Sequence, residues 1–411
     1  MFQFINRSKN WVVTIVLAII IGLTVPSLIA LASSVIGDNM VITNLTEQLR
    51  LGYNASIYTS ITTDASSSLS IIPNGSAGGW KIIKDIDSPI FISGYSGNQM
   101  TGSDTEGSAI LSGGHLLPDP PFDLYGPNVI ENNTYSVISG GEGNSITSVG
   151  GFFSGVSNFI GSGAGNIIEK GGAYSVIVGG DRNKLTSSVT YPYLDFIGGG
   201  AGNIIDSHNN SRNVIVGGSG NLIYGNGHAA IVGGQSNIAW HYGFVGGGAQ
   251  NTAGTSTKNY SVAVGGKVNT ASGYNSMILG GDTNTASGTL SFASGKRAKA
   301  YNDGSFVWAD NNNFDFLSAV NNETAFRSTG GVRFVTAIDG SGNATRTAQF
   351  ATTGDLNLNG GIKLNTVTAK PACSSTYRGM FWVTQSAAGV KDVVEVCAKD
   401  AGDAYAWRSI Y

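Results

Sequence analysis

The sequence predicts an all-β fold: a parallel β-solenoid flanked by small β-rich modules and preceded by an N-terminal hydrophobic helix. Glycine supplies 60 of the 411 residues, roughly twice its average share of about 7 %. Of these glycines, 36 lie between Tyr135 and Ala298, where a short unit recurs. A fixed period is typical of repeat architectures, in which each unit buries its apolar face against the next unit.

The charge balance narrows the classes of function. Charged residues make up 12 % of the chain and the formal net charge is −3, so no basic surface supports a nucleic-acid partner. The glycines lack a three-residue period, which excludes collagen. The histidines are four (His115, His208, His228 and His241), and their spacing matches no metal-ligand pattern. We therefore expect no metal and no cofactor.

Residues 1–32 form the first element. Arg7 and Lys9 precede an apolar run from Trp11 to Ala32, which is long enough to span a bilayer. Ala30 and Ala32 also form a small-residue pattern that a signal peptidase could cut. Both a cleaved signal peptide and a membrane anchor through residues 11–32 stay open, and either one predicts export to the cell surface or the extracellular space.

Residues 38–134 are predicted to form a β-rich N-terminal module. Short apolar alternations at Leu45–Tyr53, Ile57–Thr63 and Leu69–Ile72 are typical of strands separated by turns. A proline-dense stretch, Leu117–Pro127, indicates a boundary before the repeats.

Residues 135–310 are predicted to form the solenoid. Each unit is a β-branched run followed by Gly-Gly-x-x-Asn, as in SVISGGEGN and VIVGGSGN. The Asn positions are Asn144, Asn183, Asn203, Asn221, Asn237, Asn251, Asn269 and Asn284, with weaker copies at Asn158 and Asn166. Several spacings are about 14 residues, enough for two short strands and two turns. Both the glycines and the Asn are expected at turn positions with positive φ.

The alternation within one unit predicts that alternate side chains share one face of the strand. In Tyr260–Gly266, Val262 and Val264 share one face of the strand, and one face must be buried. The small residues of Asn269–Gly273 suit an opposite strand in a thin roll. A thin roll buries little surface alone, so we expect lateral association of rolls.

The stretch Tyr260–Asp310, YSVAVGGKVNTASGYNSMILGGDTNTASGTLSFASGKRAKAYNDGSFVWAD, resembles the head repeats of trimeric autotransporter adhesins. That resemblance, looser over 135–259, implies a YadA-like left-handed parallel β-roll and a homotrimer on a bacterial surface, often acting in adhesion. The chain lacks two features of that family, a coiled-coil heptad run and an apolar C-terminal β-anchor. Any anchoring therefore falls to the N-terminal segment.

The C-terminal region is predicted as a β-rich connector, 311–370, and a small antiparallel β cap, 371–411. Alternating segments in the cap are Met380–Thr384, Val393–Ala398 and Ala404–Ile410. Cys373 and Cys397 lie within it, and in an exported chain we expect them to form a disulfide.

Insertions between the Asn and the next β-branched run are expected along one edge of the solenoid, where such insertions often form a binding face. Their aromatic and histidine residues are candidate ligand-binding residues: Tyr191, Tyr193, His208, Trp240, His241, Tyr242 and Tyr260. The alternative is that these side chains pack at the trimer interface or cover the ends of the roll.

The sequence thus predicts an exported homotrimeric fibre with a structural or adhesive role and no catalysis. Its expected partners are copies of itself and a glycan or protein on a host or environmental surface. The alternatives are a phage-type tail fibre or receptor-binding protein and a carbohydrate-active β-helix enzyme. The first conflicts with an export segment, and the second needs convergent carboxylates that the sequence does not reveal. An ice-binding solenoid would need Thr-x-Thr in every turn, whereas Thr270 and Thr285 recur without extending.

Overall fold

The computed structural model describes residues 33–36, 39–42, 49–54, 57–63 and 67–410, apart from 74–77, 86, 115–125, 149–155, 170–172, 188–193, 209–211, 226, 258–259 and 359–368. The chain divides into two compact units, residues 1–327 and residues 328–411. The predicted N-terminal helix over residues 1–32 lies outside the described residues. Among the residues that are described, we find no helix with the length and apolarity needed to cross a membrane.

The first unit begins with antiparallel strands. β1 (Ser33–Ile36) pairs with β2 (Asn39–Ile42). A meander follows, formed by β3 (Leu49–Asn54), β4 (Ile57–Thr63), β5 (Leu69–Pro73), β6 (Gly78–Ile83) and β7 (Ile90–Tyr95). β7 then pairs in parallel with β9, so the meander continues directly into one sheet of the solenoid.

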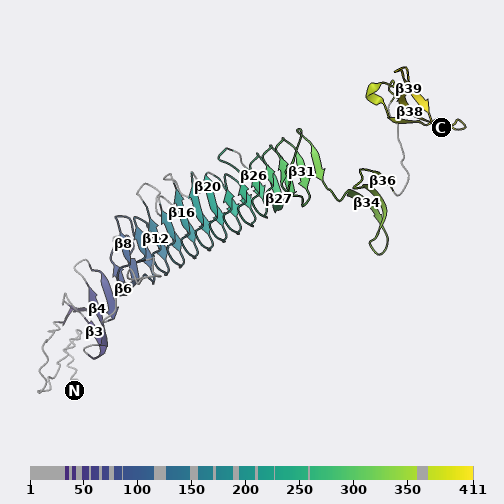
Figure 1. Ribbon diagram of the computed structural model, residues 1–411. Helices are drawn as coiled ribbons and strands as arrows, with labels where there is room; N and C mark the ends of the chain where they lie inside the picture. Colours follow the sequence, from purple (N-terminus) through teal and green to yellow (C-terminus); the bar gives the residue numbers. More distant parts are fainter. Residues whose placement is uncertain are drawn as a thin grey trace. The chain divides into compact units, whose positions relative to one another are not determined.

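The parallel β-solenoid predicted from the repeats is confirmed (Figure 1). Each turn supplies one strand to each of two sheets, and the ladders run from turn to turn. The odd sheet contains β9 (Ala109–Ile110), β11 (Val137–Ile138), β13 (Phe159–Ile160), β15 (Val176–Ile177), β17 (Phe196–Ile197), β19 (Val214–Ile215), β21 (Ala230–Ile231), β23 (Phe244–Val245), β25 (Val262–Ala263), β27 (Met277–Asp282), β29 (Phe292–Lys296), β31 (Phe306–Ala309) and β33 (Thr324–Arg327). The even sheet contains β8 (Gln99–Thr101), β10 (Val129–Glu131), β12 (Ser145–Thr147), β14 (Ile167–Glu169), β16 (Lys184–Ser187), β18 (Ile204–Ser207), β20 (Leu222–Gly225), β22 (Ile238–Ala239), β24 (Thr252–Ala253), β26 (Thr270–Ala271), β28 (Thr285–Ala286), β30 (Ala298–Ala300) and β32 (Phe316–Leu317).

The core of the solenoid lies between the two sheets. The second residue of most strands points inward and is fully buried, as period-two alternation requires. In the earlier turns this residue is mostly isoleucine on both sheets, as at Ile215 and Ile223. From β22 onward the even sheet supplies alanine instead, as at Ala239 and Ala271. The roll is therefore filled by smaller side chains in its later turns.

The repeated Asn has a different role from the expected one. Residues with positive φ are the second glycine of each unit and the residue just before the Asn, as at Gly234 (φ 88°) and Ser236 (φ 53°), whereas Asn237 is absent from the positive-φ positions. Each Asn side chain is buried inside the corner and bonds to the neighbouring turns. The expectation that Asn supplies a left-handed turn position is wrong, because the amide is needed inside, where it satisfies buried backbone groups.

Asn221 illustrates this asparagine ladder. Its backbone N–H donates to Asn203 Oδ1 at 3.0 Å, and its own Oδ1 accepts from the backbone N–H of Asn237 at 3.0 Å. Its Nδ2 donates to the carbonyl oxygens of Gly217 at 3.0 Å and Gly234 at 3.1 Å. The ladder comprises Asn98, Asn128, Asn144, Asn166, Asn183, Asn203, Asn221, Asn237, Asn251, Asn269 and Asn284. Asn166 is thus a full member, while Asn158 belongs to the opposite corner.

The parallel pairings extend beyond the predicted range 135–310 at both ends. β8 already pairs with β10, and β31 pairs with β33, which ends at Arg327. The stretch Leu117–Pro127 therefore interrupts a turn between β9 and β10 instead of separating two domains. It was misleading because it separates Ser112 and Gly113, which take the place of the glycine pair, from Asn128, whose Nδ2 donates to the Ser112 carbonyl oxygen at 3.2 Å.

The second unit contains two small antiparallel sheets. One is formed by β34 (Val332–Ile338), β35 (Ala344–Phe350) and β36 (Leu356–Leu358). The other is the cap, with a short 3₁₀ helix (Ser375–Tyr377) and strands β37 (Phe381–Thr384), β38 (Val393–Lys399) and β39 (Tyr405–Ser409).

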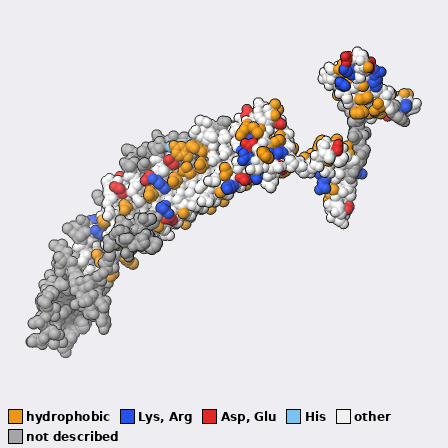
Figure 2. Space-filling model, in the orientation of Figure 1, with side chains coloured by type: hydrophobic (Ala, Val, Ile, Leu, Met, Phe, Trp, Pro, Cys, Tyr) orange, Lys and Arg blue, Asp and Glu red, His pale blue; other side chains and the backbone are white. Residues whose placement is uncertain are grey.

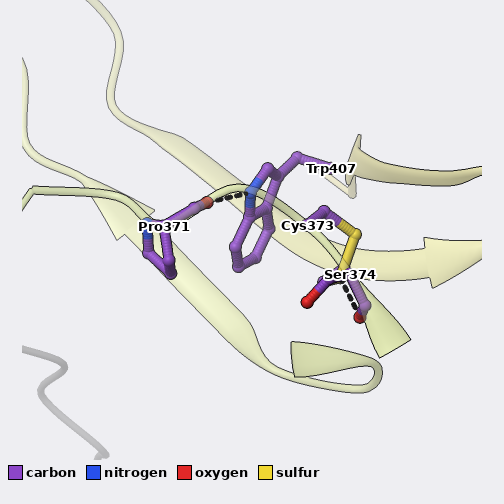
Figure 3. Close-up of a disulfide and its surroundings, with 5 residues drawn as sticks. Pro371, Cys373, Ser374 and Trp407 are labelled. Atoms are coloured by element: carbon purple, nitrogen blue, oxygen red, sulfur yellow. Dashed lines mark hydrogen bonds between the residues drawn. A yellow bond between two sulfur atoms is a disulfide. The ribbon is translucent and has the colours of Figure 1, made fainter. Parts of the chain in front are cut away.

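A disulfide joins Cys373 to Cys397 in the cap (Figure 3). The two Cα atoms lie 5.4 Å apart, and Cys397 is fully buried. Beside the disulfide, the indole N–H of Trp407 donates to the carbonyl oxygen of Pro371 at 2.8 Å. The disulfide joins the segment before β37 to β38, and the hydrogen bond of Trp407 joins the same segment to the edge strand β39. Such links are expected in a small module with little core of its own.

Candidate ligand-binding surface

Aromatic side chains gather on one edge of the solenoid, where each even strand turns into the following odd strand. The gaps 149–155, 170–172, 188–193, 209–211, 226 and 258–259 all lie in these connections. Of the predicted site residues, Tyr191 and Tyr193 lie outside the described residues. Of the other five, His208, Trp240, Tyr242 and Tyr260 fall in two rows along this edge, and His241 lies between the rows.

The first row lies on the outer side of the even sheet and is formed by His208, Tyr224 and Trp240. The ring centroids of His208 and Tyr224 are 5.0 Å apart, and those of Tyr224 and Trp240 are 4.9 Å apart, both in edge-to-face geometry. Asp206 occupies the register position next to Tyr224 on the neighbouring strand. The structure thus brings two predicted residues, His208 and Trp240, together through Tyr224, which the sequence reasoning missed.

The second row borders the odd sheet and is formed by His228, Tyr242, Tyr260 and Tyr274. His228 and Tyr242 are stacked at 5.5 Å, and Tyr242 and Tyr260 at 4.7 Å. Tyr274 continues the row edge-to-face at 5.9 Å from Tyr260. This row joins the predicted Tyr242 and Tyr260 and adds His228 and Tyr274, which were not predicted as site residues.

A tight turn connects the two rows. The backbone N–H of Gly243 donates to the carbonyl oxygen of Trp240 at 2.7 Å, so that Trp240 ends the even-sheet side and Tyr242 begins the odd-sheet side. His241 lies between them, with its ring over Gly225 of the preceding turn, where a Cβ atom would approach the ring to 2.5 Å. Gly225 therefore makes room for the imidazole of His241.

Both rows could have been predicted from the sequence by counting positions within each repeat. Tyr224 and Trp240 each lie three residues after a ladder asparagine, at the same outward position. Tyr260 lies one residue before the buried Ser261, which directly precedes β25, and Tyr242 occupies the same place before Gly243, which directly precedes β23. Equal register in successive turns places side chains one strand spacing apart, about 4.8 Å.

The outer face of the odd sheet carries a long apolar surface. The first residue of each strand points outward and is apolar in turn after turn: Val137, Phe159, Val176, Phe196, Val214, Ala230, Phe244, Val262, Met277, Phe292 and Phe306. A second outward column includes Val178, Val216, Val232, Val264 and Leu279, which are 41–53 % exposed. The even sheet is mixed at the same outward position. It presents polar residues such as Lys184, Thr252 and Thr270 in some turns, and apolar residues in others: Ile167, Ile204, Leu222 and Ile238.

A buried carboxyl group lies in the corner before the odd strands. Ser136, Asn158, Ser175, Asp195 and Asn213 form a ladder there, in which each side chain accepts from the backbone N–H of the next turn. Asp195 is 3 % exposed, accepts from the Asn213 N–H at 2.8 Å and accepts from Ser207 Oγ at 2.5 Å. Burial raises the pKa of Asp195 to about 6, although the hydrogen bonds from Ser207 and Asn213 act in the opposite direction.

Within the described part of the chain, no group of three His, Cys, Asp or Glu side chains is placed to hold a metal ion. The hollows on this part of the surface are open. One of about 500 Å³ lies beside Trp80, Tyr95 and Met100, where the meander joins the solenoid. The aromatic edge offers ring faces and a few polar groups for contact with a ligand. No model of a known protein family, no curated protein and no solved structure matches this chain.

Proposed function

We propose that this protein is an exported, homotrimeric fibre that acts at the cell surface or in the extracellular space, with a structural or adhesive role and no catalysis. The resemblance of Tyr260–Asp310 to the heads of trimeric autotransporter adhesins suggests the trimer and a left-handed, YadA-like roll. The apolar run Trp11–Ala32 suggests export, by either a cleaved signal or a membrane anchor.

The observation that carries this proposal is the apolar outer face of the odd sheet. Val178, Val216 and Leu279 are each about half exposed although they are large and apolar. Monomeric soluble proteins rarely leave an apolar strip of this length in water, since large exposed patches mark interaction sites. Because the strip repeats with every turn, the surface that fits it best is a second roll with the same repeat. Three rolls related by a three-fold axis would each cover the next.

The sheet of β34–β36 supports the same assembly. Phe334, Phe350 and Leu356 lie on one face of it and are 51–55 % exposed. A three-stranded sheet needs a covered apolar face to be stable. Equivalent sheets of the other protomers could provide that cover.

Light scattering of the purified full chain tests the assembly. We expect a trimer, and a stable monomer would contradict the proposal. Val216→Lys places a charge in the odd-sheet strip and should dissociate the trimer, whereas Thr252→Lys, on the outer face of the even sheet, should leave the mass unchanged.

Labelling intact cells with an antibody to the repeats tests the location, and protein found only in the cytoplasm would contradict export.

The second candidate is a phage-type tail fibre or receptor-binding protein, which the exposed aromatic edge would also suit. Export separates the two candidates, because virion fibres assemble in the cytoplasm. A carbohydrate-active enzyme is a third reading, which release of reducing sugar from a polysaccharide would favour.

A further inference from the structure

We propose that the first aromatic row, formed by His208, Tyr224 and Trp240 with the neighbouring Asp206, is a binding site for a neutral oligosaccharide. This inference rests on the adhesive role in the proposed function and names the ligand class of that role. It also separates the two aromatic rows, assigning recognition to the first and burial between protomers to the second.

The two rows are assigned different roles because they lie on different sheets. Tyr242 and Tyr260 lie two residues before the outward Phe244 and Val262, so the second row continues the apolar strip of the odd sheet. A trimer that covers this strip would also approach the second row. Tyr224 and Trp240 project from the opposite sheet, which faces away from the strip. Figure 2 shows hydrophobic side chains gathered over the region of β20, part-way along the solenoid.

The shape of the first row suits a sugar. In the same outward column, the three strands that precede β20 carry polar residues: Glu169, Thr186 and Asp206. Glu169 forms an ion pair with Lys184 and accepts a hydrogen bond from Thr186. After Trp240 the column continues with Gly254, which has no side chain, and then Ser272. The surface of the column is therefore raised at the indole ring of Trp240 and low at Gly254, where only backbone is present. A flat sugar ring can lie beside the indole at this point.

The chemistry of the row points the same way. Tyr and Trp offer apolar ring faces, which suit the C–H face of a sugar ring, together with a polar group. The Asp206 carboxylate accepts hydrogen bonds from hydroxyl groups, and the imidazoles of His208 and His241 can donate or accept. No Lys or Arg lies in the column from Asp206 to Ser272, so an anionic ligand would find no partner there.

The size of the row favours an oligosaccharide over a protein. The three rings span two steps of 5.0 and 4.9 Å, about 10 Å in total, two strand spacings. A stable protein interface buries about 1,200–2,000 Å² of surface, far more than three partly buried rings can supply. Two or three sugar units would fill the row.

A glycan microarray probed with the full-length protein tests the proposal, followed by calorimetric titration of the best neutral oligosaccharide. Trp240→Ala and Tyr224→Thr should each weaken binding by about tenfold or more, as expected for central aromatic contacts, and Asp206→Asn should weaken it less. Tyr135→Ala controls for the loss of an exposed ring outside the first row. Tyr135 is 54 % exposed and lies before β11, several turns from the row, so oligosaccharide binding should be unchanged.

Light scattering and thermal melting of each variant show whether it is still folded and assembled. Unchanged binding in a folded Trp240→Ala variant would overturn the proposal. So would a wild-type protein that binds no neutral glycan, or one that captures only acidic glycans or a protein partner. A monomeric protein that still binds the oligosaccharide through Trp240 would refute the trimer and leave the saccharide site standing.

Discussion

Replacing Asp195 by Asn is expected to stabilise the solenoid at neutral pH. Asp195 lies in a corner ladder that has asparagine at the next position, Asn213, and also two turns earlier, at Asn158, so an amide fits the hydrogen-bond pattern. Burial raises the pKa of Asp195 from 3.8 to about 6. The difference of about 2.2 between the two pKa values corresponds to about 3 kcal/mol. That is the upper limit of the penalty for keeping this carboxylate ionised in the folded chain.

The sign of the pH dependence follows from the raised pKa. The folded chain binds the proton more tightly than the unfolded chain, so the stabilisation by the protonated form is complete below pH 3.8. It is lost as the pH rises through about 6. The advantage of Asp195→Asn over the wild type should therefore be largest above pH 6 and small near pH 4. Asn removes the titrating group while its side-chain oxygen still accepts from the Asn213 N–H.

Thermal melting of wild type and Asp195→Asn at pH 4 and at pH 7.5, at one protein concentration, measures this difference. Asp104→Asn serves as the control, because Asp104 is exposed, and its melting temperature should follow the wild type at both values of pH. Equal stability of wild type and Asp195→Asn at pH 7.5 would refute the reasoning. An advantage that is the same at both values of pH would assign it to packing instead of ionisation.

Three further substitutions test the turns and the cap. Asn221→Ala removes the amide that serves Gly217 and Gly234; at about 1–3 kcal/mol for each buried group left unpaired, hydrogen exchange should show local opening of that corner, and protection equal to wild type would contradict this. Gly234→Ala should prevent folding of its turn, because φ is 88° and a Cβ atom would lie 2.1 Å from a neighbouring carbonyl oxygen, whereas Gly233→Ala has nothing within 4 Å and should melt like wild type. Cys373→Ser should destabilise the cap by about 3 kcal/mol, measured by proteolysis of the cap, with the solenoid still protected; an equally resistant cap would show that the disulfide contributes little.

The repeat in the sequence was sufficient to predict a parallel solenoid, two strands in each turn and one buried face in each strand. These features follow from local rules, because period-two alternation and glycine turns act within a few residues. The repeat did not show which face is buried: Ser261 and Ala263 point inward, whereas Val262 and Val264 point outward.

The extent of the solenoid was harder to predict. An insertion at 115–125 separates Gly114 from Asn128. Because this stretch is rich in proline, the sequence indicates a boundary there, although the asparagine ladder continues through Asn128.

The sequence by itself determined that this chain stacks turns of a Gly-Gly-x-x-Asn repeat and that aromatic residues fall at its connections. Tertiary structure alone decided what those residues do. The buried asparagines became a hydrogen-bonded ladder because the amide of Asn221 reaches both the turn before it and the turn after it. Trp240 and Tyr242 are two residues apart but lie on different sides of the solenoid, Trp240 on the even sheet and Tyr242 beside the odd sheet, because the turn between them reverses the chain. Contacts of this kind join residues about one turn apart, at separations that vary with each insertion, and only folding brings them into register.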